Sequence, residues 1–297
     1  WVNMLKLKAS YGVQGNDNLG YSGLHNYNYY SDHYSVADSN GDFALSLSFK
    51  GNKDLTWESS HNFNTGFDFG FFKNRVRGTV EYFSRKTVDM LYERPVAPSS
   101  GYSALPMNIG SMKNYGWEVE LNANLYEGRN FRWDAYGNAT FVKNKIIALH
   151  PELNGKFISG STIYEEGESM YQLYLIKYAG VDPNSGKALY YAKTQMTEDQ
   201  AKAELLEKYG IEEPKQEQID ELIEDFDKNR AEVYVTDDAQ AAQDTYKCAT
   251  GDLLPKVYGG FGTSLEFHGF DLSVQFAYQL GGKLWDYTYQ DLMHNGK

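Results

Sequence analysis

The feature that most constrains the fold is the stretch from Trp57 to Phe141, where polar and less polar residues alternate and the chain reverses at two short polar turns. Successive side chains of a β-strand point to opposite faces of a sheet, so a period of two residues predicts strands. Within the first strand, one face carries Trp57, Ser59, His61, Phe63, Thr65, Phe67, Phe69 and Phe71. Alternation over the whole chain predicts strands at 5–11, 57–71, 76–82, 115–125, 131–141, 171–180, 187–193, 261–267 and 270–280.

The length of these strands decides between two classes of β protein. A soluble sandwich or propeller also alternates, but its strands usually run about 5 or 6 residues. The longest segments here far exceed that length and place aromatic residues near their ends, which is typical of a membrane barrel whose apolar face meets lipid. We therefore predict an all-β fold, a transmembrane antiparallel β-barrel seen in part as about nine strands, with long outer loops and a small helical insertion.

Composition is consistent with a barrel and excludes a helical membrane protein. The 297 residues contain no run of 18 apolar residues and have a mean hydropathy of −0.59, whereas a membrane-spanning helix needs about 20 apolar residues. The net charge is −12, but residues 194–252 hold 17 acidic and 6 basic residues, a net charge of −11. No cluster of basic residues predicts nucleic-acid binding.

The strand pattern also predicts which loops lie outside the cell. Short turns at 72–75 and 127–130 are typical of the periplasmic side, which places 12–56 and 93–110 outside. Residues 43–49 are then loop substructure rather than a barrel strand, and prolines in 93–110 are expected to break any regular pattern. We expect three parts: barrel strands and outer loops in 1–193, an acidic helical insertion in an extracellular loop at 194–252, and further strands with the start of an outer loop in 253–297.

The acidic insertion changes from a strand period to a helix period. Thr197 and Gln200 have the spacing of a capping box that begins a helix ending near Tyr209. Pro214 suits the first position of a second helix, in which Ile219, Leu222, Ile223 and Phe226 fall on one face. Two amphipathic helices are therefore predicted, and their apolar faces must cover something.

Tyrosines in the first long loop are the best candidates for a ligand surface. Tyr27, Tyr29, Tyr30 and Tyr34 are interspersed with amides and a carboxylate. Aromatic faces suit the C–H faces of sugars, and the neighbouring polar groups suit hydroxyls. The alternatives are packing within the loop or docking onto a partner protein.

The sequence predicts neither a catalytic site nor a metal site. The histidines are scattered without the spacing of a metal site, and no nucleophile lies in a recognisable catalytic arrangement. We expect no cofactor and no bound metal, and we do not expect an enzyme. Asp182-Pro183-Asn184-Ser185-Gly186 starts like a calcium loop but lacks its later glutamate, so a β-turn is the better interpretation.

Several short motifs, in this order, resemble one family. They are Asp54-Leu55-Thr56-Trp57-Glu58, Asn64-Thr65-Gly66-Phe67-Asp68-Phe69-Gly70, Glu81-Tyr82-Phe83-Ser84-Arg85-Lys86-Thr87, Asn108-Ile109-Gly110-Ser111-Met112-Lys113-Asn114-Tyr115-Gly116-Trp117-Glu118, Asn144-Lys145-Ile146 and Gly180-Val181-Asp182-Pro183-Asn184-Ser185-Gly186. Together they resemble the C-terminal barrel half of the SusC/RagA-type TonB-dependent outer-membrane transporters of Bacteroidetes. The resemblance covers nearly all of the chain except residues 194–252.

The resemblance implies a large barrel in the outer membrane that imports glycans or peptides. It also implies two partners, a SusD-like surface lipoprotein that forms a lid and the TonB complex, which acts through an N-terminal box and plug absent from this sequence. The substrate class, glycan or peptide, stays open. The alternative is an outer-membrane binding or adhesion barrel that displays its loops without active transport.

Overall fold

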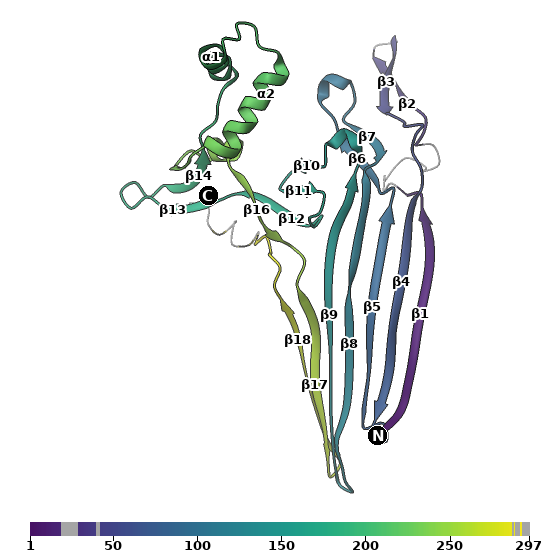
Figure 1. The fold of residues 1–297 in the computed structure, drawn as a ribbon. Helices are drawn as coiled ribbons and strands as arrows, with labels where there is room; N and C mark the ends of the chain where they lie inside the picture. Colours follow the sequence, from purple (N-terminus) through teal and green to yellow (C-terminus); the bar gives the residue numbers. More distant parts are fainter. Residues whose placement is uncertain (19–28, 40–41, 287, 289–291, 293–297) are drawn as a thin grey trace. The chain divides into compact units, whose positions relative to one another are not determined.

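The computed structural model describes residues 1–18, 29–39, 42–286, 288 and 292 of the chain (Figure 1). The chain divides into two compact units. Unit 1 comprises residues 1–159, 163–172 and 252–297, and unit 2 comprises 160–162 and 173–251.

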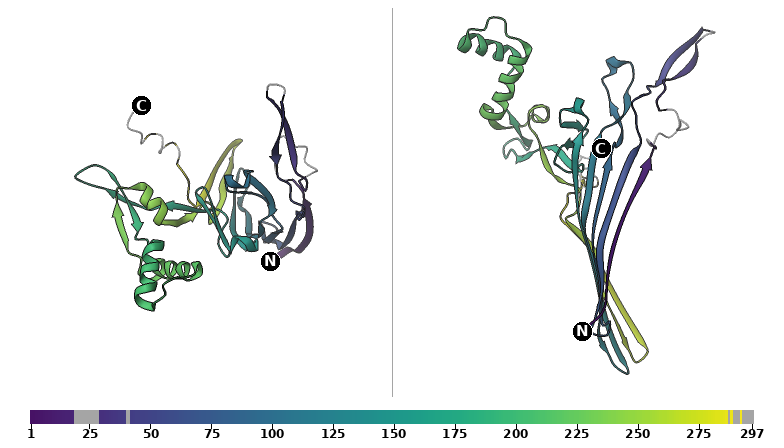
Figure 2. Two further views of the ribbon diagram at one scale, coloured as in Figure 1. Left: turned by 90° about the horizontal axis from the view of Figure 1, so that it is seen from above. Right: turned by 45° about the vertical axis from the view of Figure 1, so that its right-hand side comes forward.

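Unit 1 contains an antiparallel sheet of seven long strands that lie side by side (Figures 1 and 2). Its order is β1 (Val2–Asn16), β4 (Glu58–Phe71), β5 (Val76–Val88), β8 (Gly110–Glu127), β9 (Phe131–Leu149), β17 (Val257–Phe267) and β18 (Phe270–Leu280). Each strand pairs with the next along this order in antiparallel register. Seven of the nine predicted strands are confirmed, and most are longer than the sequence pattern predicted.

The turns that join these strands explain the tight reversals. Between β4 and β5, Phe72, Lys73 and Asn74 all have positive φ, at 54°, 59° and 63°. The backbone N–H of Lys73 donates to Oδ1 of Asn3 at 2.6 Å, which fixes this turn against the start of β1. Between β17 and β18, His268 and Gly269 have φ of 49° and 86°, as a two-residue hairpin turn of the primed type requires.

Glycines in the sheet lie opposite aromatic residues of the neighbouring strand. Directly opposed pairs are Phe69 with Gly78, Phe83 with Gly116, Tyr136 with Gly262, and Tyr278 with Gly259. In each pair a Cβ on the glycine would come within 3.0 Å of the aromatic side chain, at its hydroxyl in the case of Tyr278 and at its ring in the others. The ring therefore occupies the space that a side chain would otherwise fill, a device that compensates for glycine in a strand.

Adding a methyl group at Gly116 should destabilise the sheet. A Cβ there would lie 1.8 Å from the carbonyl oxygen of Phe141 and 2.9 Å from the ring of Phe83. We expect Gly116→Ala to cost about 1 to 3 kcal/mol through overpacking. Gly137→Ala is the matched control, because its Cβ would meet nothing closer than 3.4 Å. Denaturant unfolding of the full-length protein in detergent measures both, and equal midpoints would refute this account of the glycines.

Two hairpins follow the strand ends on one side of the sheet. β2 (His33–Ser39) pairs with β3 (Asp42–Phe49), which confirms 43–49 as loop substructure. β6 (Leu91–Pro95) pairs with β7 (Ala104–Asn108), and a 3₁₀ turn at Pro98–Ser100 connects them. The prediction that prolines leave 93–110 irregular is therefore wrong. In a hairpin of two strands both are edge strands, and edge strands tolerate proline.

A small core lies where β8 begins and β9 ends. Met90, Ile109, Ile146, Leu149 and Leu153 are buried together. Leu153 belongs to a 3₁₀ turn, Pro151–Leu153, which precedes β10 (Lys156–Ser159) and its neighbour β11 (Thr162–Glu165). The rings of Phe157 and Tyr164 stack across these two strands with centroids 4.5 Å apart. The loops at this end are thus folded, not merely extended.

Two of the predicted barrel strands do not belong to the barrel sheet. Residues 171–180 and 187–193 form β12 (Gln172–Ile176), β13 (Tyr178–Val181) and β14 (Ala188–Lys193), none of which belongs to the seven-stranded sheet. β12 pairs with β16 (Lys247–Asp252), while β14 lies between β13 and β15 (Val233–Thr236). Because β9 pairs directly with β17, residues 150–256 form one connection. Period-two alternation identifies a strand but does not say which sheet it joins.

Unit 2 contains both predicted helices and a further short helix that was not predicted. Its helical segments are α1 (Glu198–Tyr209), α2 (Gln216–Asp225), a π-helical turn at Phe226–Arg230 and α3 (Ala239–Thr245). The capping box of Thr197 and Gln200 is present. The prediction for Pro214 is wrong, because α2 begins two residues later at Gln216, after the N-cap residue Lys215.

The apolar faces of α1 and α2 cover each other. Ala201, Leu205 and Ile219 are buried together, with Met196, Ile211, Leu222 and Ile223 packed around them. Among the described residues, no helix combines the length and apolar character that crossing a bilayer needs.

Candidate functional site

The register of the seven-stranded sheet separates its side chains into two chemically different faces. On one face, Phe69, Gly78, Leu121, Gly137 and Phe261 lie directly opposite one another across five strands. On the other, neighbouring positions include Asp68, Glu120, Asn122 and Asn138. The following residues share the first face: Phe63, Phe67, Phe69, Val119, Leu121, Ala135, Val274 and Phe276. The pairing thus supports the common face that alternation predicted for them.

Lys8 connects two carboxylates on the polar face. Lys8 of β1 lies between two carboxylates, with its Nζ 2.9 Å from Asp68 Oδ1 and 3.2 Å from Glu81 Oε2. The hydroxyl of Thr79 donates to Asp68 at 2.9 Å. The groups span three adjacent strands and remain partly exposed, so this face suits water and the apolar face does not.

Trp117 and Trp133 lie at two different levels of the apolar face. Trp117 packs against Tyr82 with centroids 5.2 Å apart. Toward the short turns, Trp133 donates from Nε1 to Oγ1 of Thr263 at 2.8 Å. Between these two levels the face carries aliphatic side chains such as Val119 and Leu121 together with further rings, among them Phe69 and Phe261. Aromatic girdles that flank an apolar band are typical of an outer-membrane barrel wall.

Motif residues behind the family resemblance have structural roles. The amide of Asn108 donates to the carbonyls of Thr56 and Asp89, at 2.9 and 2.7 Å, and its Oδ1 accepts from the N–H of Thr56 at 2.9 Å. Asn144 donates to Asn114 at 2.7 Å and accepts from the N–H of Met170 at 2.8 Å. Both asparagines hold the start of a loop to a strand end.

Asp182 forms a turn, in agreement with the sequence interpretation. Its carboxylate accepts from the N–H groups of Asn184 and Ser185, at 3.1 and 3.3 Å, and from the Ser185 hydroxyl. The hydroxyl hydrogen bond is the main reason that the pKa of Asp182 lies below its ordinary value. Among the described residues, no group of three or more His, Cys, Asp and Glu side chains could hold a metal ion.

The four candidate tyrosines have different environments. Tyr27 lies outside the described residues. Tyr29 is only 8% exposed, and its ring packs on Phe49 with centroids 6.0 Å apart. Tyr30 and Tyr34 are 56% and 59% exposed. Of the three described tyrosines, two can therefore meet a ligand directly, and Tyr29 holds the loop.

Tyr29 and Tyr30 line a hollow of about 200 Å³ in unit 1. The other lining residues are Asp17, Leu55, Thr56, Trp57 and Leu91. The hydroxyl of Tyr29 is buried and has no hydrogen-bond partner among the described residues. The hollow combines aromatic faces with one carboxylate, which is chemistry suited to a polar ligand with an apolar face. Sequence reasoning missed Trp57 and Asp17, because they are far from the tyrosine cluster along the chain.

A local hydrogen-bond network fixes the backbone around these tyrosines. Asp32 accepts from Lys50 Nζ at 2.8 Å and from the N–H of Gly51 at 2.9 Å. The N–H of Asn52 donates to the carbonyl of Tyr29 at 2.8 Å. The hydrogen bond from Lys50 is the main cause that lowers the pKa of Asp32 below its ordinary value. Tyr30 therefore projects from a held loop base.

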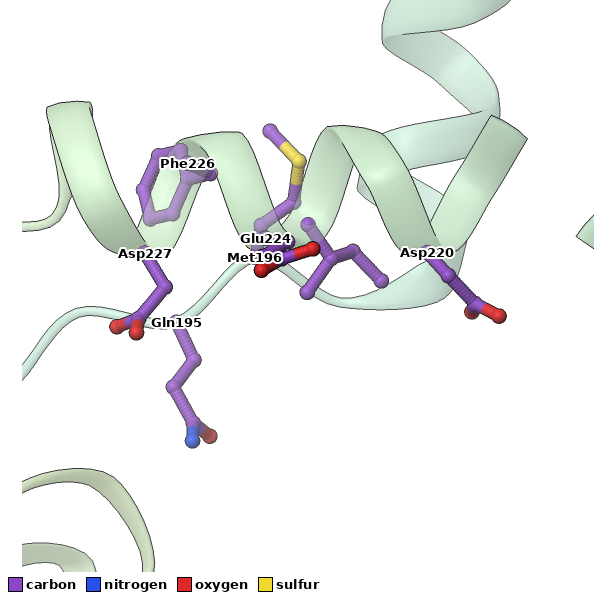
Figure 3. A pocket seen from close by; sticks show the side chains of 7 residues that line it. Gln195, Met196, Asp220, Glu224, Phe226 and Asp227 are labelled. Atoms are coloured by element: carbon purple, nitrogen blue, oxygen red, sulfur yellow. The ribbon is translucent and has the colours of Figure 1, made fainter. Parts of the chain in front are cut away.

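Unit 2 has a hollow of its own on α2 (Figure 3). It has a volume of about 470 Å³, with Met196, Ile223 and Phe226 as its apolar part. Its three carboxylates already have partners: Asp220 accepts from Gln216, Glu224 from Lys228, and Asp227 from Lys193. These internal contacts leave little unsatisfied charge for a ligand.

Comparisons with known proteins agree with the two-faced sheet. The family model described as "TonB dependent receptor-like, beta-barrel" matches residues 1–197. The TonB-dependent receptor P39 of Formosa agariphila is 34% identical over 181 residues, which is 61% of this chain and 17% of that protein. The TonB-dependent receptor SusC of Bacteroides thetaiotaomicron is 26% identical over 302 residues, which is 98% of this chain and 26% of that protein.

Solved structures give the same result. The RagAB peptide importer in its closed-closed state aligns with a TM-score of 0.70 at 28% identity, covering 95% of this chain and 27% of that one. The RagAB peptide transporter aligns with a TM-score of 0.69 at 29% identity. The chain therefore spans about a quarter of the length of most relatives that it matches.

Proposed function

The chain belongs to the TonB dependent receptor-like β-barrel family, and from this premise we propose that it forms part of the wall of an outer-membrane importer. The importer takes up glycans or peptides under the control of the TonB complex. A SusD-like surface lipoprotein is its partner at the cell surface. The chain carries out no chemistry on its cargo in this proposal.

The observation that carries this proposal is the division of one continuous sheet into a polar and an apolar face. Seven adjacent strands keep this division through the middle of the sheet, with Lys8 between two carboxylates on one side and rings and aliphatic groups on the other. In a barrel the apolar face meets outer-membrane lipid and the polar face lines a wet lumen. Such a wall separates a path for polar cargo from hydrocarbon.

The edges of the sheet support a larger barrel. β1 and β18 each have a pairing partner on one side only among the described residues. A strand edge left unpaired in hydrocarbon costs several kcal/mol for each exposed backbone group. We infer that further strands of a longer protein pair with β1 and β18 and close the barrel.

Uptake should depend on the energy supplied by TonB. In cells that express the full-length protein, deleting TonB should reduce accumulation of labelled cargo inside the cell by at least tenfold and leave capture at the cell surface unchanged. A barrel that only binds or adheres would give the same signal in both strains. Equal accumulation with and without TonB would therefore reject import and favour the binding alternative.

The connection that contains the acidic insertion is proposed to be extracellular. The short turns 72–75, 128–130 and 268–269 share one end of the sheet, and the connections 17–57, 89–109 and 150–256 share the other. The two predicted strands that do not belong to the barrel would have crossed the membrane in opposite directions. Leaving them out therefore does not change the side of the membrane on which the insertion is predicted to lie. The long connections are the outer ones if the barrel follows the usual pattern.

An epitope inserted after Gly210 tests this orientation. Gly210 ends α1 with a φ of 67°, and a side chain there would meet nothing within 4 Å, so an insertion should be tolerated. We expect antibody to label intact cells as strongly as permeabilised ones. A matched epitope in the turn at Arg129 should label only permeabilised cells. The opposite pattern would invert the assigned topology.

A further inference from the structure

The strand β15 leaves one edge of its sheet open. The sheet has the order β13, β14, β15, so β15 pairs with β14 on one side and has no strand on the other among the described residues. Natural proteins usually protect such an edge with lysine, proline or a bulge. β15 reads Val233-Tyr234-Val235-Thr236 and has none of these.

The hydrogen-bond phase shows which backbone groups the open edge presents. Just beyond the two strands, the N–H of Thr194 donates to the carbonyl of Glu232 at 2.9 Å, and the N–H of Glu232 donates to Oγ1 of Thr194 at 2.9 Å, so these two residues occupy a hydrogen-bonded position of the ladder. Bonded pairs alternate along an antiparallel ladder, so Tyr234 is bonded to β14, whereas Val233 and Val235 direct their N–H and C=O groups away from it. Consistently, the N–H of Lys193, opposite Val233, donates to Oγ1 of Thr245 and not to β15.

Side chains along this edge also suit a further strand. Val233 and Val235 lie on the same face and are 49% and 50% exposed. β-Branched side chains at such positions gain burial when a neighbouring strand covers them. The edge therefore offers the backbone N–H and C=O groups of two residues, Val233 and Val235, beside their two apolar side chains.

The charge around the strand favours a basic partner. Glu232 precedes β15, and Asp237 and Asp238 follow it, although Asp237 also pairs with Lys187 and Asp238 caps α3. These residues belong to the segment 194–252, whose net charge is −11. Opposite charge both steers association and stabilises the bound pair.

We propose that the outer edge of β15 captures an extended peptide with basic side chains by strand addition, and that such a peptide is the cargo of the importer. A sugar chain has no alternating N–H and C=O groups, whereas a peptide strand matches the spacing of Val233 and Val235. The identification as cargo rests on the proposed import function. The binding step itself does not.

Binding is tested with full-length protein in detergent and a fluorescent hexapeptide of alternating valine and lysine. The same peptide with every internal amide nitrogen methylated keeps its charge and side chains but cannot donate strand hydrogen bonds. We expect the methylated probe to bind at least tenfold more weakly, as measured by fluorescence anisotropy. Equal affinity would overturn strand addition. Absence of binding by the unmethylated probe, as when another segment of the full-length protein covers β15, would overturn it as well.

Variants of Val235 test the edge from the side of the protein. Val235→Pro removes an N–H group that β14 does not use, and proline is tolerated at strand edges. We expect it to weaken binding of the unmethylated probe at least tenfold, whereas the control Val235→Thr, which keeps the N–H and the β-branch, should stay within about twofold. Equal binding by both variants contradicts the proposal. The methylated and unmethylated peptides are compared on the unmodified protein, so that part of the test does not depend on folding of the proline variant.

Uptake separates this inference from the proposed function. If TonB-dependent uptake persists in cells but the probe does not bind, only strand addition fails. If the probe binds as expected and uptake is independent of TonB, import fails and the peptide site remains.

Discussion

Replacing Leu121 by arginine is expected to destabilise the barrel by about 2 to 4 kcal/mol, the cost of a cation near the middle of the lipid-facing band. Leu121 lies on the apolar face between the levels of Trp117 and Trp133, opposite Gly78 and Gly137. None of the described strand residues on this face offers the guanidinium a carboxylate partner, so it must either enter hydrocarbon or distort the sheet to reach water. The amount of folded protein recovered from the outer membrane should fall steeply.

The neighbouring residue supplies a matched control. Asn122 lies on the polar face, where its amide donates to Glu120 at 3.0 Å. Asn122→Arg introduces the same charge one residue away and places it beside that carboxylate. We expect near-normal assembly and a shift in unfolding free energy below about 1 kcal/mol, since an exposed ion pair contributes little. If both variants assemble equally well, or if the order is reversed, the assignment of lipid and lumen faces is wrong.

The long strands were predictable because the two environments of a barrel wall repeat every second residue. The strands from Trp57 to Phe141 carry this signal without interruption, and their register agrees with the predicted faces. Alternation does not specify the partner strand, however. This is why residues 171–193 were assigned to the barrel, although β14 pairs with β13 and β15 instead.

Burial within the loops was not predictable, because it depends on contacts between distant segments. Tyr29 and Tyr30 are adjacent in the sequence, yet Tyr29 packs on Phe49 and Tyr30 remains exposed. Likewise, Asp17 and Trp57 meet the tyrosines only because β1 and β4 pair and bring their ends together. The apolar stripe of α2 was predictable, but only the structure shows that α1 covers it.

Converting Tyr30 and Tyr34 together to alanine is expected to weaken ligand capture by about fivefold to 150-fold. Each exposed ring that stacks on a ligand contributes about 0.5 to 1.5 kcal/mol, by analogy with aromatic pairs, and a tenfold change in affinity corresponds to 1.4 kcal/mol. Strand pairing holds the barrel, so its unfolding should not change. Tyr29 is left out of this variant because truncating a buried aromatic costs about 3 to 5 kcal/mol and would disturb the loop itself. Binding and uptake of labelled cargo by cells measure the effect.

Two comparisons decide what these rings do. The double variant Tyr30→Phe with Tyr34→Phe keeps both rings and should retain most of the affinity if stacking is the source of binding. If the tyrosines instead hold the surface lipoprotein, the alanine variant will no longer co-purify with that partner. If they bind cargo, it will co-purify normally and import poorly. Normal co-purification together with normal uptake would remove both roles, and the two rings would then serve only the packing of the loop that Asp32 and Lys50 hold in place.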